Sequence, residues 1–572
     1  MGHDPVVAGK TARAESESPP PLTAVVVDEP IEASPRRQSG GRSSVVADPP
    51  SELAAAKEPV RWRELLAILL AIALADLTIY RGHGFAGYAA LFAASTFLLL
   101  LGTPRLRSHA AAGLVVVMLL VLAAKLAWCG HAGLVAAGFV LIVAVAMTLA
   151  GRKPYVLDIA VYALQTPVAG WIGLSHYMRS ADSLQRRGPP RGGWLSVGLP
   201  LVAVLAFGAL FVLANPDLAA SFRETLRWAF DSFADWLRRF SPTWGELFFW
   251  VAVAWLVIGL LRPVVRDSVL AGLSTRDDRG DWATAPPAES PLYAAVRNTL
   301  AAVIVLFAVY LGFEFKTLWF KTFPKGFYYA GYAHEGAAWL TVALALATAV
   351  LSLVFRGRIL HDPRLSRLRK LAWIWSAENL VLALAVYHRL FIYIGFNGMT
   401  RMRTVGLFGI SAVAVGFILV VWKIIHSRNF AWLLHRHLWT LAVALYLLAV
   451  TPVDPIVHAY NVRRVLADDP APVVQVSVHP ISSEGMLVLP PLAHSRDRII
   501  REGIRAMLAD RAAQLGSLVR RRQSEGWTAF QLADRVLLER LQAVRNDWQE
   551  YTDPDKRAAA LNRFHAYAYQ WY

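Results

Sequence analysis

Long runs of apolar residues, separated by short basic loops, constrain this chain more than any other feature of its sequence. A helical run of about twenty apolar residues matches the thickness of the hydrocarbon core of a bilayer. Lipid offers the backbone no hydrogen-bond partners, so only helices or closed barrels cross it. These runs do not alternate apolar and polar residues as barrel strands do. The sequence therefore predicts an all-α fold, a polytopic transmembrane helical bundle.

We expect about eleven transmembrane helices within residues 62–451. The predicted spans are Leu65–Ile79, Gly84–Leu101, Ala110–Trp128, Gly133–Ala150, Trp194–Ala214, Gly245–Leu261, Ala294–Phe313, Ala337–Phe355, Leu371–Ile394, Val405–Ile425 and Leu438–Val450. Residues 1–61 are rich in Pro, Ser, Ala, Glu and Arg without periodicity, which predicts a disordered N-terminal tail. Residues 452–572 are predicted to form a small extramembrane domain.

Two further segments are predicted to lie at the membrane surface. Segment 155–177 is apolar but contains Asp158, Gln165 and Pro167, and a span here would place the basic loop that follows it outside. We interpret it as interfacial or re-entrant. Segment 217–240 carries Leu and Phe at helical spacing and charged residues on its other faces, which is typical of an interfacial helix. It could instead cap the bundle.

The distribution of charge predicts the orientation of the chain. The formal net charge is +17, and many of the Lys and Arg residues, such as Arg105 and Arg152, lie in short loops between spans. That pattern favours topology signals over nucleic-acid binding, and it places the N-terminus in the cytoplasm. Five basic residues in predicted outside connections go against this rule: Lys316, Lys321, Lys325, Arg401 and Arg403. With eleven spans, the C-terminal domain lies outside the cytoplasm. The single cysteine excludes an internal disulfide.

The C-terminal domain is predicted to contain a short hairpin followed by three helices. Val474, Val476 and Val478 alternate with polar residues, which predicts a strand, and a turn at 482–485 would pair it with Met486–Leu489. The helices are expected at about 495–522, 528–551 and from Asp553 onward. Asp553 as N-cap with Pro554 at the first helical position is a helix start signal.

Several segments, in their order along the chain, resemble a large bacterial family of multi-pass membrane proteins known only as a domain of unknown function. These segments are Asp76–Tyr80 with Gly82, Gly84 and Gly87, Asn215-Pro216, Asn298–Tyr310, Gly331–Gly336, the late-span G-x-T-R-x-R step at Gly398–Arg403, Asp454-Pro455 and Tyr460–Arg464. The resemblance covers most of residues 62–466. It implies a multi-pass protein of the bacterial inner membrane and carries no mechanism.

Ionisable and amide side chains within the spans form a first candidate site, because charges inside a bilayer are costly. The candidates are Glu378, Asn379, Arg297, Asn298, Asp76 and Lys125. Asp76 and Lys125 could pair near the outer ends of their spans, or they could snorkel to the interface. Glu378 and Arg297 could join two helices, or Glu378 could belong to a proton or substrate relay.

A second candidate site is a polar pocket at the outer ends of the later spans. Its predicted residues are Glu314, His334, Glu335, His388, Arg389, Arg401 and Arg403. The arginines suit an anionic headgroup or substrate. Interfacial anchoring explains the same residues. The spacing of the two His and two Glu residues matches no recognised metal-ligand pattern.

The sequence contains no P-loop, G-x-G-x-x-G, H-E-x-x-H, C-x-x-C or G-x-S-x-G pattern, so no cofactor or metal is predicted. We interpret the chain as a non-catalytic envelope protein that senses or binds a partner. A protein partner would bind through the C-terminal domain, and the bilayer is the surrounding medium. The alternatives are a small-molecule or lipid transporter, which internal repeats would favour, and a membrane-embedded transferase that uses the outer pocket.

Overall fold

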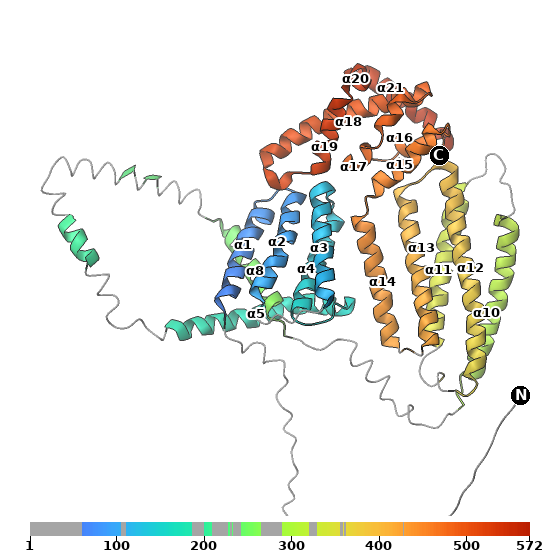
Figure 1. Ribbon diagram of the computed structural model, residues 1–572, viewed down its shortest axis with the longest axis horizontal. Helices are drawn as coiled ribbons and strands as arrows, with labels where there is room; N and C mark the ends of the chain where they lie inside the picture. The colour runs from blue at the N-terminus through green and yellow to red at the C-terminus, as the bar shows by residue number, and fades with distance from the viewer. Residues whose placement is uncertain are drawn as a thin grey trace, which may run out of the picture. The chain divides into compact units, whose positions relative to one another are not determined.

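Helices make up all the regular structure in the part of the chain that the computed structural model describes, and no strand occurs there (Figure 1). The structure describes residues 60–103, 110–185, 200–208, 227–228, 231–232, 242–264, 289–319, 329–354, 359, 362–426, 428 and 430–572. The chain divides into two compact units, Met1–Ser51 and Glu52–Tyr572, and every described residue belongs to the second. The predicted disordered tail lies almost entirely outside the described residues. The predicted all-α, polytopic membrane architecture is confirmed.

A first bundle surrounds a core that includes Phe92, Leu119 and Leu126. Its helices are α1 (Trp62–Ala75) with a π-helical extension (Asp76–Tyr80), α2 (Phe85–Gly102), α3 (Ala110–Cys129), α4 (Ala132–Leu149) and α8 (Trp244–Leu261). Large apolar side chains such as Leu69 and Phe97 are exposed on the outside of this bundle. Helices that are apolar on every face are stable in lipid, where such surface needs no covering.

A second bundle forms around Leu300, Trp375 and Phe417. Its helices are α10 (Tyr293–Glu314) with a π-helical extension (Phe315–Trp319), α11 (Tyr329–Val354), α12 (Leu365–Asn397), α13 (Arg401–Ile425) and α14 (Phe430–Val450). Helix α14 joins the two bundles. It packs on α13, and its Tyr446 hydroxyl donates to the carbonyl of Met118 on α3 at 2.9 Å.

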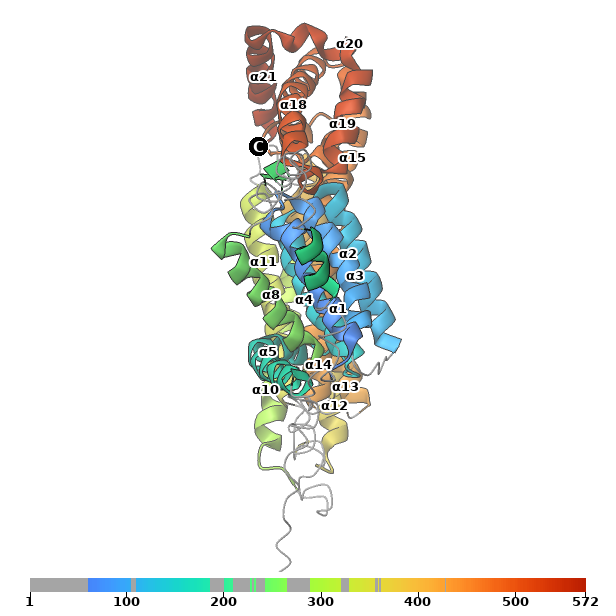
Figure 2. The same ribbon diagram turned by 90° about the vertical axis from the view of Figure 1, so that its left-hand side faces the viewer.

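Helix α5 (Val156–Gln185) runs across the first bundle rather than along it (Figure 1), and Figure 2 shows the same helix end-on. Its contacts agree with a crossing. Tyr162 donates to the carbonyl of Leu260, and Tyr177 lies against Arg262, so the final turn of α8 meets a long stretch of α5. By length and composition α5 also qualifies as a span. Its direction across the other helices supports the interfacial interpretation of 155–177.

Nine of the described helices are long and apolar enough to cross a membrane. They include α5 and eight of the eleven predicted spans. Of the other three, α1 with its π-helical extension covers Leu65–Ile79, a shorter apolar stretch at Ala338–Ser352 lies in the predicted Ala337–Phe355, and the helical residues 200–208 lie in the predicted Trp194–Ala214. The interfacial helix predicted at 217–240 falls outside the described residues, except for 227–228 and 231–232.

The described helices before and after the predicted span at Trp194–Ala214 contact opposite ends of the first bundle. Tyr177 packs against Arg262, and Arg262 pairs with Glu64 at the start of α1. Thr243, before α8, instead bonds to Tyr80 at the opposite end of the bundle. The chain therefore passes from one end of the bundle to the other between residues 177 and 243.

The last 120 residues form a helical domain with its own core, drawn in orange and red in Figure 1. We call residues 453–572 the C-terminal domain. Its elements are α15 (Val453–Leu466), α16 (Val473–Ser477), α17 (Ser483–Met486), the 3-10 turn Pro490–His494, α18 (Arg498–Glu525), the 3-10 turn Trp527–Ala529, α19 (Leu532–Ala543), α20 (Arg545–Trp548), the 3-10 turn Gln549–Thr552, α21 (Pro554–Ala568) and the 3-10 turn Tyr569–Trp571. Ile504, Leu508, Leu537 and Phe564 are fully buried in its core.

The predicted hairpin at 474–489 is wrong, because Val473–Ser477 and Ser483–Met486 are short helices. The strand was predicted because Val474, Val476 and Val478 alternate with polar residues in the sequence. Val473, Val474, Gln475 and Val476 are all buried, so every face of this turn is covered and a period of two carries no information. Asp553 does cap α21, as predicted, by accepting a hydrogen bond from the Asp555 amide at 2.9 Å. The predicted second helix is interrupted at Val544, between α19 and α20.

Candidate functional site between the spans and the C-terminal domain

The C-terminal domain contacts the ends of both bundles through hydrogen bonds. On the first bundle, Gln531 Nε2 donates to the carbonyl of Leu126 at 3.0 Å, and its Oε1 accepts from the Gly130 amide at 2.6 Å. On the second, Asn397 Nδ2 donates to the carbonyl of Trp571 at 3.2 Å. Both termini of the loop between α12 and α13 thus lie beside this domain. We call this interface between the bundles and the C-terminal domain the junction; of the predicted site residues, Lys125, Arg401 and Arg403 lie in it.

Lys125 lies in this junction, but its partner is not Asp76. Lys125 Nζ is 2.6 Å from Glu484 Oε2, and Trp128 Nε1 donates to the same oxygen at 3.1 Å. Asp76 is 3.0 Å from Arg81 and accepts a hydrogen bond from Trp250 Nε1 at 2.9 Å. Asp76 and Lys125 therefore do not pair with each other, because Lys125 forms its ion pair with Glu484 of the C-terminal domain.

Arg297 and Glu378 do not meet either. The Arg297 guanidinium is exposed and donates to Asn298 Oδ1 at 3.2 and 3.1 Å. Asn379 is fully buried and donates to the carbonyl of Trp375 at 2.8 Å. Glu378 Oε2, Asn379 Oδ1 and Trp375 Nε1 are buried without a hydrogen-bond partner in the described chain. These three atoms form a polar cluster at the middle of α12, separate from the junction.

Glu314 and Arg389 form the most enclosed ion pair of the predicted outer pocket. Arg389 donates through Nε and Nη2 to the two oxygens of Glu314, each at 2.6 Å, and the Tyr310 hydroxyl donates to Oε2 at 2.9 Å. The Glu314 side chain is 1% exposed. A side chain at Gly336 would collide with the Arg389 guanidinium, so α11 needs a glycine there. This pair joins α10 to α12.

The remaining residues of the predicted outer pocket separate into different places. His388 precedes Arg389 on α12 and is half-buried. His334 and Glu335 lie in α11, but their side chains lie outside the described part. Arg389, Tyr393 and Asn397 follow one another on the buried side of α12, and Asn397 ends that helix about two turns after Arg389. Arg401 and Arg403 lie beyond this end, in the first turn of α13. The structure therefore supports a site around Arg401 and Arg403.

Arg401 ties the start of α13 to the C-terminal domain. Its Nε and Nη2 donate to the two oxygens of Asp454 on α15. The Ser482 amide also donates to Asp454, at 2.9 Å. Burial alone would raise the pKa of Asp454, but the hydrogen bonds from Arg401 and Ser482 outweigh burial and lower this pKa to about 2. Asp454 is therefore ionised at neutral pH, and its charge balances that of Arg401.

Arg403 is buried in a different way, without a carboxylate. Its side chain is 2% exposed and lies over the Tyr393 ring, 3.6 Å from the centroid. Its guanidinium donates to the Gly398 carbonyl and, at 2.5 Å, to Asn397 Oδ1. No ion pair joins it to an acidic residue in the described part of the chain. The positive charge of Arg403 is thus solvated by neutral groups alone.

The loop that carries Arg403 is held by Asn461 of the C-terminal domain. Asn461 Oδ1 accepts from the Met399 amide at 2.7 Å, and its Nδ2 donates to the Met399 carbonyl at 2.9 Å. Gly398 makes this approach possible, because its φ of 98° and ψ of −174° define a region that is essentially restricted to glycine. A Cβ there would lie 2.6 Å from Asn461 Oδ1.

A cavity of about 560 Å³ lies beside this loop. Its lining residues are Tyr393, Asn397, Met399, Thr400, Arg401, Met402, Arg403, Val457, His458, Gln475, His479, Pro480 and Tyr572. We call this cavity the junction pocket, since α12, α13, α15 and α16 all contribute to it. Its size falls in the range of small-molecule sites, about 300–1,000 Å³. It contains both arginines of the G-x-T-R-x-R step.

Two polar side chains of the junction pocket have no hydrogen-bond partner. His458 is 4% exposed, and its Nδ1 is buried without a hydrogen-bond partner in the described chain. Gln475 is 5% exposed, and its side-chain amide makes no hydrogen bond to another described residue. Burial, together with the positive charge of Arg401, lowers the pKa of His458 to about 4 although Asp454 opposes the shift. His458 is therefore neutral at physiological pH. Buried amides and imidazoles are normally satisfied, so these groups mark a place for a ligand or ordered water.

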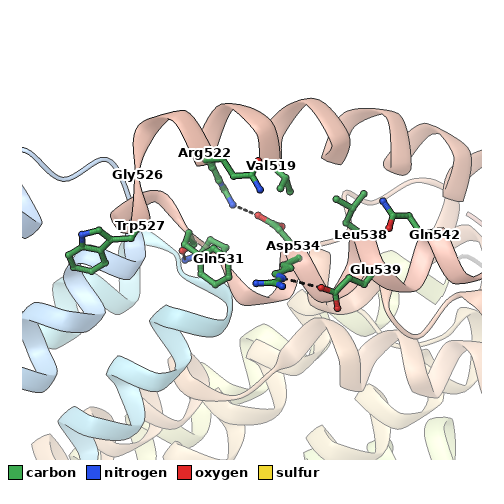
Figure 3. Close-up of a pocket in the computed structure, with 12 residues that line it drawn as sticks. Val519, Arg522, Gly526, Trp527, Gln531, Asp534, Leu538, Glu539 and Gln542 are labelled. Atoms are coloured by element: carbon green, nitrogen blue, oxygen red, sulfur yellow. Dashed lines mark hydrogen bonds and ion pairs between the residues drawn. The ribbon is translucent and has the colours of Figure 1, made fainter.

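A second cavity of about 480 Å³ lies between the end of α18 and α19. Figure 3 shows Arg522 paired with Asp534 along its wall, and Glu539, also labelled there, pairs with Arg535 at 3.0 Å. Asp534 also accepts a hydrogen bond from Ser483, so its charge is fully engaged. Trp527 stands at the edge next to the first bundle. The charged residues of this cavity are paired with each other, unlike Arg403 in the junction pocket.

Metal binding has no support in the described residues, since no group of three or more His, Cys, Asp or Glu side chains there could hold a metal ion. Nothing about chemistry is excluded on this ground. The junction pocket offers donors and positive charge, and its acidic neighbour Asp454 is already bonded to Arg401 and Ser482.

Fold and site together define a polytopic α-helical membrane protein with a docked C-terminal helical domain. The family described as a domain of unknown function (DUF4153) matches residues 86–477, and the chain belongs to that family. The match reaches from α2 to α16, so it includes the G-x-T-R-x-R step, Asp454, Asn461 and Gln475. No curated protein and no solved structure matches the chain.

Sequence reasoning missed several residues that build the junction. Asp454 and Asn461 stand in segments that carried the family resemblance, and this was the only signal for them. Glu484, Gln475 and His458 gave no signal, because each lies in a segment whose polar residues look solvent-exposed. The buried pair of Glu64 and Arg262, 2.6 Å apart, was also missed, since each residue sits at the edge of its span.

Proposed function

We propose that this protein is a non-catalytic sensing or interaction protein of the bacterial inner membrane, with its N-terminus in the cytoplasm and its C-terminal domain outside. The observation that carries the proposal is the junction. The C-terminal domain is tied to the first bundle by Lys125 and Glu484 and to the second by Arg401 and Asp454. A domain fixed to both bundles is suited to pass a binding event at the cell envelope to the spans.

The pairing of charges supports the proposed orientation. At the end next to the C-terminal domain, several cations have acidic partners, whereas Arg403 has none among the described residues. Arg81 is bonded to Glu246 at 3.0 Å, and Lys125, Arg389 and Arg401 are likewise paired. The positive-inside rule counts an excess of Lys and Arg in cytoplasmic loops. Arg105, Arg107 and Lys153 lie, by sequence, in loops that we assign to the cytoplasmic side under this rule.

A transporter is the second candidate, and one observation favours it. Glu378, Asn379 and Trp375 each leave a buried polar atom without a partner at the middle of α12. Polar groups within a bilayer often line a path for an ion or substrate. A membrane-embedded transferase, the third alternative, would require both Glu335 and His388 of the predicted outer pocket. The two leading candidates make opposite predictions for the same pair of variants.

The discriminating experiment is complementation of a host strain that lacks its own copy of the gene, scored by growth under envelope stress. Glu484→Lys places two cations together at Lys125 and should abolish complementation, whereas Glu378→Gln should complement. Reversing the pair with Lys125→Glu in the Glu484→Lys background should restore growth. Membrane levels of all variants are measured by immunoblot. Loss of growth with Glu378→Gln at normal protein level, together with full complementation by Glu484→Lys, would establish the transporter instead.

A further inference from the structure

We propose that the junction pocket binds a phosphate group, supplied either by the headgroup of an anionic phospholipid or by a soluble phosphate compound. The proposal deepens the proposed function, because it assigns the chemical class of ligand that the junction would detect. It rests on three features of the pocket: its uncompensated charge, its unused hydrogen-bonding groups and its position at the ends of two spans.

The first feature is the net charge of the lining. Arg401 and Arg403 line the pocket, and its lining contains no Asp or Glu; Tyr572, the last residue of the given sequence, also lines it. Asp454 balances Arg401, which leaves the charge of Arg403 uncompensated. Burying a charge without a counter-charge is costly, and an anion in the pocket would remove that cost. Thr400 caps α13, so the positive end of that helix dipole adds to the same potential.

The positive electrostatic potential of the pocket also acts on His479, one of the lining residues. Burial, and then the charges of Arg403 and Arg401, lower the pKa of this imidazole. Burial and nearby groups lower the pKa of His458 in the same way: Arg401 and His479 both lower it, and only Asp454 raises it. Both histidines are therefore neutral at pH 7, and each retains one N–H for donation.

The second feature is the arrangement of free hydrogen-bonding groups. Arg403 donates to the Gly398 carbonyl and to Asn397 Oδ1, and a guanidinium has five N–H groups, so further donors of Arg403 remain for a ligand. Gln475 on α16 and His458 on α15 contribute unpartnered groups from two other elements. Donors on three sides suit the tetrahedral oxygens of phosphate, whereas a carboxylate presents its two oxygens in one plane.

The third feature is location. Arg401 and Arg403 stand at the first turn of a span, where the headgroups of a bilayer lie. Met402 is exposed between them and gives that position an apolar side chain. A lipid whose phosphate enters the pocket can keep its acyl chains beside the spans. A soluble phosphate compound would use the same donors, and the two sources differ in how they reach them.

The test compares the full-length chain with Gln475→Leu in nanodiscs of phosphatidylcholine. Leucine fills the space of the buried amide without an unpaired polar group, so this variant should fold with equal or higher basal stability. Gln514→Leu is the matched control, because Gln514 is an exposed glutamine of α18 that bonds to Asp510. Melting temperature is measured against inorganic phosphate, against chloride at equal ionic strength, and against discs that contain phosphatidylglycerol.

We expect phosphate or phosphatidylglycerol to raise the melting temperature of the native chain and of Gln514→Leu beyond the effect of chloride. Gln475→Leu should need an about tenfold higher concentration for the same shift, as for the loss of one hydrogen bond to a charged group. A response to phosphatidylglycerol without one to inorganic phosphate identifies a lipid headgroup. A response to inorganic phosphate without one to phosphatidylglycerol identifies a soluble ligand, and responses to both support the phosphate site common to them. Equal responses of Gln475→Leu and the native chain, or no response beyond chloride, would overturn the proposal. Failure of this binding test would leave the proposed function standing, because the complementation test uses other variants, Glu484→Lys and Glu378→Gln.

Discussion

Glu314→Gln is expected to lower the free energy of unfolding by about 3–5 kcal/mol, the usual cost of removing one partner from a buried ion pair. Arg389 would keep its charge among the spans while losing the carboxylate that accepts two of its hydrogen bonds at 2.6 Å. The Tyr310 hydroxyl would lose its charged acceptor as well. Unfolding in mixed micelles with increasing dodecyl sulfate measures this loss directly.

Two variants test whether the loss comes from the orphaned charge. Replacing both partners, with Glu314→Leu and Arg389→Met, should recover most of the stability, because no charge is then buried. Glu539→Gln removes a partner from the exposed pair with Arg535 and should cost no more than about 1 kcal/mol. If the single and double replacements at Glu314 are equally unstable, the pair is not the source of the stability.

Gly398→Ala should be the most damaging small substitution at the junction. The φ of 98° with ψ of −174° costs a residue with a Cβ about 1–3 kcal/mol. The added methyl group would also lie 2.6 Å from Asn461 Oδ1 and 2.9 Å from Pro472 Cβ, so the loop and the C-terminal domain would have to separate. We expect lower thermal stability and faster proteolysis between the spans and the C-terminal domain.

Gly409→Ala is the matched control, because a Cβ at Gly409 meets nothing within 4 Å. In the middle of α13, alanine should stabilise the helix by about 0.5–1 kcal/mol relative to glycine. Opposite signs for the two substitutions would show that Gly398 is required by the junction. A Gly398→Ala variant as stable and as protease-resistant as Gly409→Ala would contradict the described contact with Asn461.

The membrane architecture followed from hydropathy because burial in lipid dominates every other preference of a span. Positions such as Ala132–Leu149 are apolar on all faces, so their identity as spans needs no knowledge of their neighbours. The start of α21 was predicted for a similar reason, since Asp553 and Pro554 act within one turn. Signals that are local in the sequence could therefore be predicted.

The partners in the site could not be predicted, because they are distant in sequence and depend on packing. Lys125 and Glu484 are 359 residues apart, and Arg401 and Asp454 are joined only once the C-terminal domain docks. The turn at Val473–Ser477 shows the same limit, since tertiary burial covered both the valines and Gln475. The motif at Gly398–Arg403 marked the right place, but its role depends on Asn461, His458 and Gln475 from another domain.

The proposed function depends on the C-terminal domain lying outside the cytoplasm. Paired fusions of alkaline phosphatase and green fluorescent protein after Tyr572, in a bacterial host, measure it most directly. An odd number of spans with the N-terminus in the cytoplasm predicts phosphatase activity without fluorescence. Fluorescence without phosphatase activity would place the domain in the cytoplasm, and it would show that α5 crosses the membrane or that a predicted span does not.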